Sequence, residues 1–141
     1  MIGDLPDLIA KRAALSPQAV ALEDAASGRT LTYAALDARA GRAAALMAAK
    51  GVGEGDRVAI LTRNRLEFFE LLFGCAKLGA VLVPLNWRMP PAELDGLIAD
   101  AQPALLFHGA AEAAAARALA APPPARAERS PKGRTSSAPG R

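Results

Sequence analysis

The stretch GVGEGDRVAILTRNRLEFFELLFGCAKLGAVLVPLN, residues 51–86, decides the fold of this chain. It begins at the end of a helix. Val58–Leu61 is a continuous apolar run, which is typical of a strand covered by helices on both faces. A helix over Arg65–Leu78 and a second strand over Ala80–Pro84 follow. Together they predict one right-handed β-α-β crossover and therefore a parallel sheet.

The helix over residues 65–78 is apolar almost all round, so we expect it to be buried on more than one side. Asn64 and Glu67 have the spacing of a capping box, with Asn in place of the usual Ser or Thr. Gly79 supplies the stop signal. Pro84 removes a backbone donor from the strand that follows.

Three glycines, Gly51, Gly53 and Gly55, precede the first buried strand. A dinucleotide-binding loop follows a strand and opens a helix, so that backbone N–H groups meet the phosphates. Here the order is reversed, because the glycines end a helix and lead into a strand. We interpret them as a helix cap and a turn.

The N-terminal part predicts a short amphipathic helix over Leu5–Leu15. A hairpin follows, with strands over Ala19–Glu23 and Arg29–Thr32. Next comes a long helix over Tyr33–Lys50, with Thr32 as its N-cap and Gly51 at its C-terminal cap. Its expected apolar stripe consists of Leu36, Ala40, Ala43 and Met47.

Beyond residue 86 the pattern predicts a helix over Ala92–Ala101 and a third short strand over Ala104–Phe107. We therefore expect residues 1–109 to form an α/β region with an open parallel sheet. The sheet is incomplete, because nothing in the pattern covers its far edge.

The segment 110–141 differs in composition from the rest. Residues 110–121 are rich in alanine and have helical propensity, whereas residues 122–141 contain five prolines and no large apolar side chain. We expect this low-complexity tail to be disordered. The net charge of +3 also comes from it: residues 1–110 hold 11 basic and 12 acidic residues, whereas residues 111–141 hold 6 and 2. The folded part thus has no basic excess to attract nucleic acid.

The length of 141 residues and the 52% hydrophobic content allow one domain with a buried core. No apolar run is long enough for a membrane span, and residues 1–10 lack the pattern of a signal peptide, so we expect a cytoplasmic protein. Cys75 is the single cysteine. Among Phe and Leu residues it should be buried with a raised pKa and therefore be inert.

Few residues suggest a binding site. His108 follows a predicted strand, but without nearby acidic or cysteine ligands it predicts an exposed or structural residue. Arg63 and Arg65 flank Asn64 at a helix start, where they form either a small anion patch or a solvated cap. Trp87 and Arg88 follow the second strand, and we expect an exposed loop with a partly buried indole, a minor binding role being the alternative.

The order of these landmarks resembles the N-terminal part of the AMP-forming acyl-CoA synthetases, within the adenylate-forming superfamily. The match extends over about residues 5–108, and its elements are Leu31–Tyr33, Leu36, Gly51–Val52, Gly55–Ile60, Asn64, Glu67, Gly79–Val81, Val83–Asn86, Glu93–Leu94 and Asp100. The resemblance implies the large domain of such an enzyme. In this neighbourhood, Trp87 and Arg88 would border the substrate-bearing half or a subunit contact.

The resemblance implies a ligase that joins a carboxylate to coenzyme A, with ATP and Mg²⁺ as cofactors of the full-length enzyme. It also implies a phosphate-binding loop similar to TSGTTGxPKG, a later aromatic–Thr–Glu segment, an Asp for the ribose and a C-terminal Lys. Residues 1–141 contain none of these, and the nearest stretch, Gly133–Ser137, lacks the second glycine and the Pro-Lys-Gly. We therefore assign no catalytic, cofactor-binding or metal-binding residue, and expect no cofactor on this part alone.

Two hypotheses follow. In the first, the chain is part of a ligase involved in fatty acid metabolism and is inactive alone. In the second, it is a binding module that pairs with a complementary chain or with itself through the exposed sheet edge. The composition of the tail suggests a frameshifted or truncated gene, and a natural short protein with a basic tail is the alternative. Nucleic-acid binding through the tail is disfavoured because no aromatic residues are interleaved.

Overall fold

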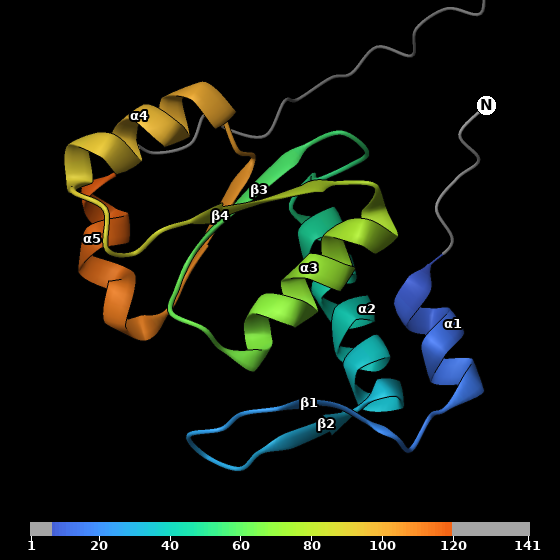
Figure 1. The fold of residues 1–141 in the computed structure, drawn as a ribbon. Helices are drawn as coiled ribbons and strands as arrows, with labels where there is room; N and C mark the ends of the chain where they lie inside the picture. The colour runs from blue at the N-terminus through green and yellow to red at the C-terminus, as the bar shows by residue number, and fades with distance from the viewer. Residues whose placement is uncertain (1–6, 120–141) are drawn as a thin grey trace, which may run out of the picture.

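Three parallel strands form the centre of the fold (Figure 1). The computed structural model describes residues 7–119, so the predicted disorder of residues 122–141 lies outside the described part. The strands are β3 (Arg57–Leu61), β4 (Val81–Leu85) and β5 (Leu105–His108). Their order is β4-β3-β5, with β3 in the middle. Val58 pairs with Leu82 on one side and with Leu105 on the other.

Helices cover both faces of this sheet, as the continuous apolar run of β3 predicts. Helices α2 (Tyr33–Ala49) and α3 (Leu66–Leu78) lie on one face, where they pack around Val58 and Ile60. Helices α4 (Pro91–Ala101) and α5 (Ala113–Ala118) lie on the other face, around Ala59 and Leu61. Because successive side chains of a strand point to opposite faces, β3 contributes to both cores.

The helices α2 and α3 approach each other closely at Gly74. A Cβ atom at Gly74 would lie 3.0 Å from Met47 Cε, 3.1 Å from Ala43 Cβ and 3.2 Å from the carbonyl oxygen of Ala40. Glycine therefore permits this contact where a larger residue would push the helices apart. The predicted stripe of α2 is confirmed, except that Ala44 is buried where Ala43 is only partly so.

A third, smaller core joins the N-terminal elements to the two helices. Helix α1 (Leu8–Leu15) and the antiparallel hairpin of β1 (Val20–Glu23) and β2 (Thr30–Thr32) enclose it. Its buried residues are Ile9, Leu31, Leu36 and Leu66. The predicted hairpin is thus confirmed, and α1 begins later than predicted because Asp7 caps it, its carboxylate accepting a hydrogen bond from the Ala10 N–H at 3.1 Å.

The glycine signals are confirmed. Gly51, Gly55 and Gly79 have φ angles of 86°, 76° and 67°, in the left-handed region that favours glycine. The Asp56 carboxylate also accepts a hydrogen bond from the Gly53 N–H at 2.8 Å. The stretch 51–55 is therefore a helix cap and a turn, as expected.

The predicted capping box of α3 is wrong. Arg65 occupies the N-cap position in extended backbone, and no side chain caps the helix. Asn64 lies one residue too early for its side chain to accept a hydrogen bond from an N–H group of the first turn. Glu67 lies inside that turn, where its negative charge interacts favourably with the helix dipole. The prediction that α3 is buried on more than one side is confirmed, because its residues contribute to two of the cores. Phe69 and Leu72 nevertheless remain 36% and 37% exposed.

Two further boundaries differ from the prediction. Strand β4 continues through Pro84 to Leu85, because among residues 7–119 β4 is an edge strand, where a missing N–H is tolerated. After β5, a 3₁₀ turn η1 (Ala110–Glu112) leads into α5, so the alanine-rich segment is helical as far as Ala118. Among residues 7–119, no helix has the length and apolar character needed to cross a membrane.

Candidate functional site

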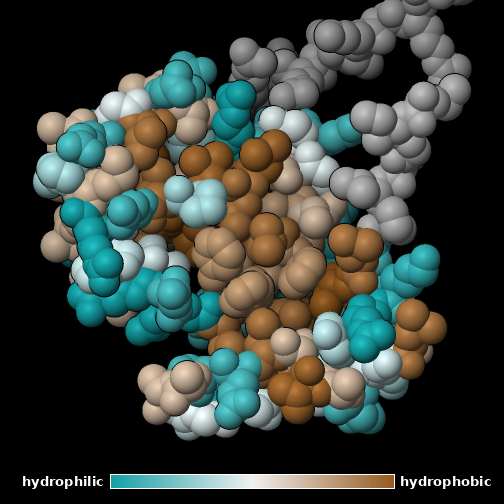
Figure 2. Space-filling model, in the orientation of Figure 1, coloured by the Kyte–Doolittle hydropathy of each residue, from teal (hydrophilic) through white to brown (hydrophobic). Residues whose placement is uncertain are grey.

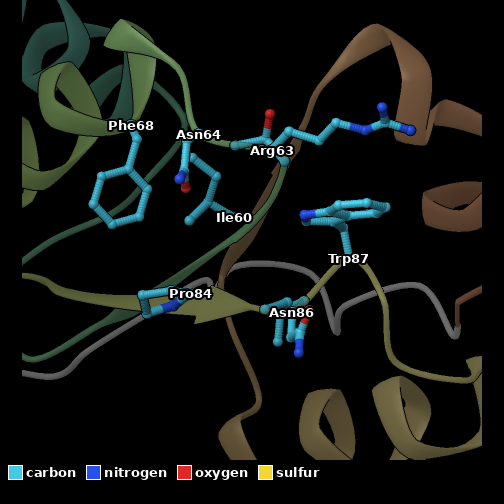
Figure 3. Close-up of a pocket in the computed structure, with 9 residues that line it drawn as sticks. Ile60, Arg63, Asn64, Phe68, Pro84, Asn86 and Trp87 are labelled. Carbon is cyan, nitrogen blue, oxygen red and sulfur yellow. The ribbon is translucent and has the colours of Figure 1, made fainter.

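A pocket of about 210 Å³ lies where β3 and β4 end (Figure 3). Because parallel strands of one sheet end at the same edge, their following loops meet there, and ligands of α/β proteins bind at such edges. We call it the Trp87 pocket, and its lining residues are Ile60, Thr62, Arg63, Asn64, Phe68, Pro84, Leu85, Asn86 and Trp87. It is partly apolar and carries two amides and one guanidinium.

Two arginines stack on Trp87. The guanidinium carbon of Arg63 lies 4.5 Å from the centroid of the indole ring, and that of Arg88 lies 4.8 Å from it. Figure 3 shows the Arg63 side chain extending over the indole ring, the two residues coming from the loops that follow β3 and β4. Trp87 is 37% exposed, which confirms the expected loop position with a partly buried indole. Such cation–π contacts orient the guanidinium groups.

Arg63 also forms an ion pair with Glu112. The Arg63 Nε donates to Glu112 Oε1 at 3.2 Å, and the Glu112 residue is only 7% exposed. Its carboxylate lies against Gly109, where a Cβ atom would collide with it. A buried carboxylate needs a charged or hydrogen-bonding partner, so Arg63 fastens the segment after β5 to the end of β3. Sequence reasoning missed Glu112, because nothing in an alanine-rich run indicates burial.

Thr62 and Asn86 contribute further polar groups to the Trp87 pocket. The hydroxyl oxygen of Thr62 is buried and has no hydrogen-bond partner among residues 7–119. The Asn86 side-chain oxygen accepts a hydrogen bond from the Arg88 N–H at 3.0 Å, which turns the loop that presents Trp87. The pocket therefore combines a planar apolar wall with positive charge, and it has the chemistry to contact an anionic group or a flat ring.

The structure brings together only some of the residues singled out in the sequence. The pocket is lined by Arg63, Asn64 and Trp87, and Arg88 stacks on the Trp87 indole ring. Arg65 is exposed and outside the lining, so the expected anion patch reduces to Arg63. His108 is exposed, with its Nδ1 2.9 Å from the Gly109 carbonyl oxygen, which agrees with a structural role.

Nothing among the described residues gathers metal ligands, since residues 7–119 contain no group of three His, Cys, Asp or Glu side chains suited to an ion. Cys75 is 1% exposed, and burial raises the pKa of its thiol to about 11. A thiol with this pKa is protonated at neutral pH, so it does not act as a nucleophile there. The expected burial and raised pKa of Cys75 are confirmed, and its low reactivity stays a prediction.

Comparison with known proteins places the chain in a known class. A family model described as AMP-binding enzyme matches residues 9–138, and the chain belongs to that family. Within it, the chain corresponds to an N-terminal part of an adenylate-forming enzyme, which confirms the resemblance noted in the sequence.

Particular relatives are acyl-CoA ligases. A feruloyl-CoA synthase of Amycolatopsis is 44% identical over 111 residues, which are 79% of this chain and 22% of that protein. The long-chain-fatty-acid–CoA ligase FadD13 of Mycobacterium tuberculosis is 39% identical over 119 residues, which are 82% of this chain and 24% of that protein. The chain thus spans about a quarter or less of the length of these two curated relatives.

Solved structures agree with the fold. The N-terminal domain of FACL13 from Mycobacterium tuberculosis superposes with a TM-score of 0.76 at 38% identity, over 82% of this chain and 30% of that chain. The o-succinylbenzoate CoA synthetase MenE from Bacillus subtilis, solved with AMP, has a TM-score of 0.71 at 32% identity, over 76% and 28%. The predicted α/β class with a parallel sheet is therefore confirmed.

Proposed function

We propose that this chain is a structural portion of an AMP-dependent acyl-CoA ligase and that it is inactive alone. In the complete reaction a carboxylate attacks the α-phosphorus of ATP, pyrophosphate leaves, and the coenzyme A thiol then displaces AMP from the acyl group. The observation that carries the proposal is that the family fold is present over only about a quarter of a relative such as FadD13. Residues 1–141 contain no loop of the TSGTTGxPKG kind to hold the β- and γ-phosphates.

The chain's own contribution is to build one side of the large domain. Its sheet presents the Trp87 pocket at the carboxyl ends of the parallel strands, where α/β proteins place ligands. Arg63 and Arg88 carry positive charge there. We assign no catalytic, cofactor-binding or metal-binding residue to it. ATP, Mg²⁺, coenzyme A and the carboxylate are proposed for the full-length ligase, whose location we propose to be the cytoplasm.

A second candidate function is an interaction module. Figure 2 shows apolar side chains gathered on the face over β4, between α3 and α4. Phe69, Leu72, Val81 and Leu97 are among the exposed large apolar residues of these elements. An apolar surface beside a strand such as β4, whose outer edge has no strand partner among residues 7–119, favours association with another chain or with a second copy.

The test of the main proposal is ATP–pyrophosphate exchange. Purified chain 1–141 is incubated with ATP, Mg²⁺, labelled pyrophosphate and long-chain, aromatic or short carboxylates in turn, with full-length FadD13 as the positive control. We expect no exchange above the protein-free background with any acid. Exchange that co-purifies with the chain and is lost when the chain is heat-inactivated would overturn the proposal. Size-exclusion chromatography of the same sample addresses the second candidate, which a discrete dimer would favour.

A further inference from the structure

The Trp87 pocket has mainly apolar walls. They come from β3, α3, β4 and the loop after β4, and their apolar side chains are Ile60, Phe68, Pro84, Leu85 and Trp87. Figure 3 shows Phe68 and Trp87 on opposite sides of Ile60. Aromatic side chains on two sides favour a flat ligand, because stacked and edge-to-face ring contacts add to the hydrophobic gain.

The size of the pocket limits its ligand to about one ring. Its volume is about 210 Å³. Clefts that hold drug-sized molecules measure roughly 300–1,000 Å³, whereas an apolar cavity of about 150 Å³ is large enough to bind benzene. A benzene-sized ring with one small substituent therefore matches the pocket, and a long acyl chain would extend out of it.

The positive charge on the wall of the pocket is balanced. Of the described residues that line it, only Arg63 is charged, and its Nε donates to Glu112 Oε1 at 3.2 Å. Glu112 is only 7% exposed, so water screens its charge little. Arg88 stacks on the Trp87 ring but does not line the pocket. An anion inside the pocket would lose its hydration and meet a cation that is already paired, which is costly.

Asn64 supplies hydrogen-bonding groups at this site. It lines the pocket, it is exposed, and its side-chain amide has no hydrogen-bond partner among residues 7–119. Figure 3 shows its side chain beside Phe68 and Ile60. An amide both donates and accepts hydrogen bonds, so it complements an amide or a hydroxyl group on a ligand.

We propose that the Trp87 pocket binds an uncharged planar ring that carries an amide or a hydroxyl group, and that it selects against carboxylates and phosphates. Glu112 determines this specificity, because it cancels the charge of Arg63 on the pocket wall. The aromatic walls hold the ring, and Asn64 binds its polar substituent. The inference goes beyond the proposed function, since such binding needs neither ATP nor any further part of a ligase.

The experiment compares two probes of the same shape, benzamide and benzoate, which differ in charge. Chain 1–141 is titrated with each, and Trp87, the only tryptophan of the chain, reports binding through its fluorescence. We expect a saturable change with benzamide. Benzoate should bind at least about tenfold more weakly, because its carboxylate is desolvated without an unpaired cation. Inorganic phosphate should have no effect.

Three variants test the roles of single residues. Glu112→Gln removes the balancing charge and should raise the affinity for benzoate relative to benzamide at least about fivefold. Asn64→Ala should weaken benzamide binding about threefold, which corresponds to one hydrogen bond. Arg65→Ala is the matched control, because Arg65 is the exposed neighbour outside the lining, and it should leave benzamide binding unchanged. Circular dichroism verifies that each variant is folded.

Several results would overturn the inference. Benzoate that binds the unmodified chain as tightly as benzamide would contradict the selection against anions. Equal effects of Asn64→Ala and Arg65→Ala, or no relative gain of benzoate in Glu112→Gln, would remove the assigned roles. No binding of benzamide, by fluorescence and by equilibrium dialysis, would remove the site itself. None of these readouts uses ATP or pyrophosphate, so this inference and the proposed function can each fail alone.

Discussion

Arg63 at the end of β3 pairs with Glu112 of η1, with 3.2 Å between Nε and Oε1, and the two partners differ greatly in exposure. The Arg63 side chain is 61% exposed, whereas that of Glu112 is 7% exposed. The cost of breaking the pair therefore depends on which partner remains. An exposed guanidinium is solvated by water, but a buried carboxylate is not.

We predict that Arg63→Ala destabilises the fold more than Glu112→Ala does. The first variant leaves a buried carboxylate without its cation and should lower the free energy of unfolding by about 1–3 kcal/mol. The second leaves a solvated arginine and should cost less than about 1 kcal/mol from the pair itself. Urea unfolding followed by circular dichroism measures both. The double variant should be more stable than Arg63→Ala alone, and the opposite order would show that Glu112 needs no partner.

Gly74 gives a second prediction. Gly74→Ala introduces a methyl group 3.0–3.2 Å from Met47, Ala43 and the Ala40 carbonyl oxygen, and the last of these belongs to the helix backbone and cannot turn aside. Overpacking costs about 1–3 kcal/mol, which exceeds the gain of about 1 kcal/mol in helix propensity. We expect net destabilisation and a lower midpoint in urea.

Gly41 and Gly96 are matched controls for Gly74, because both lie inside helices and a Cβ atom at either meets nothing within 4 Å. Their replacement by alanine should raise the free energy of unfolding by about 0.5–1 kcal/mol. Stabilisation by all three substitutions would mean that the contact between α2 and α3 is looser than its distances indicate.

The order of elements could be predicted because each has a local signal. The run Val58–Leu61 is apolar at every position, and the structure uses both of its faces, with Val58 in one core and Ala59 in the other. Likewise Thr32 begins α2, where its Oγ1 accepts from the Ala35 N–H at 3.2 Å, and Gly79 ends α3. Caps, glycines and periodicity act within a few residues, so a single sequence shows them.

The Trp87 pocket could be predicted only in part. Arg63 and Trp87 each follow a strand, but their stacking depends on the register of β3 with β4, in which Leu61 lies opposite Leu85. The burial of Glu112 depends on a contact over 49 positions of sequence. The capping propensity of Asn64 predicts a start of α3 one residue too early, whereas Arg65 is the N-cap residue. Such features arise from tertiary packing, which no local pattern records.

Lys77 gives a pH-dependent prediction. Its ammonium group donates to Asp37 Oδ1 at 2.6 Å and to Asp7 Oδ2 at 2.7 Å, and thereby joins α3 to α2 and to the cap of α1. Burial opposes the charge of Lys77, but the two carboxylates outweigh it and raise the pKa of Lys77 above 10.5. Burial likewise acts to raise the pKa of Asp7, but the hydrogen bonds from Lys77 and the Ala10 N–H lower it below 3.8.

These two pKa shifts determine how the stability of the fold changes with pH. The lowered pKa of Asp7 adds stability above about pH 4 that is lost as the pH falls through the folded value. The raised pKa of Lys77 adds stability below about pH 10 that is lost as the pH rises through its folded value. Lys77→Met should therefore cost about 0.5–1 kcal/mol near neutral pH and less at both extremes. Lys11→Met, at an exposed position of α1, is the control and should change little. A pH-independent cost would indicate lost packing instead.

Cys75 gives the last prediction, which concerns reactivity. Its sulfur lies 3.8 Å from the Met47 sulfur in the core between α2, α3 and the sheet, and the pKa of its thiol is raised to about 11. At pH 8 only about one thiol in a thousand would be ionised, and burial also blocks the reagent. We expect iodoacetamide to alkylate the folded protein at least about a hundredfold more slowly than the protein in urea. Because the chain has one cysteine, a single mass increase reports this site. Equal rates with and without urea would show that the core opens readily, and that α3 needs further polypeptide to hold it in place.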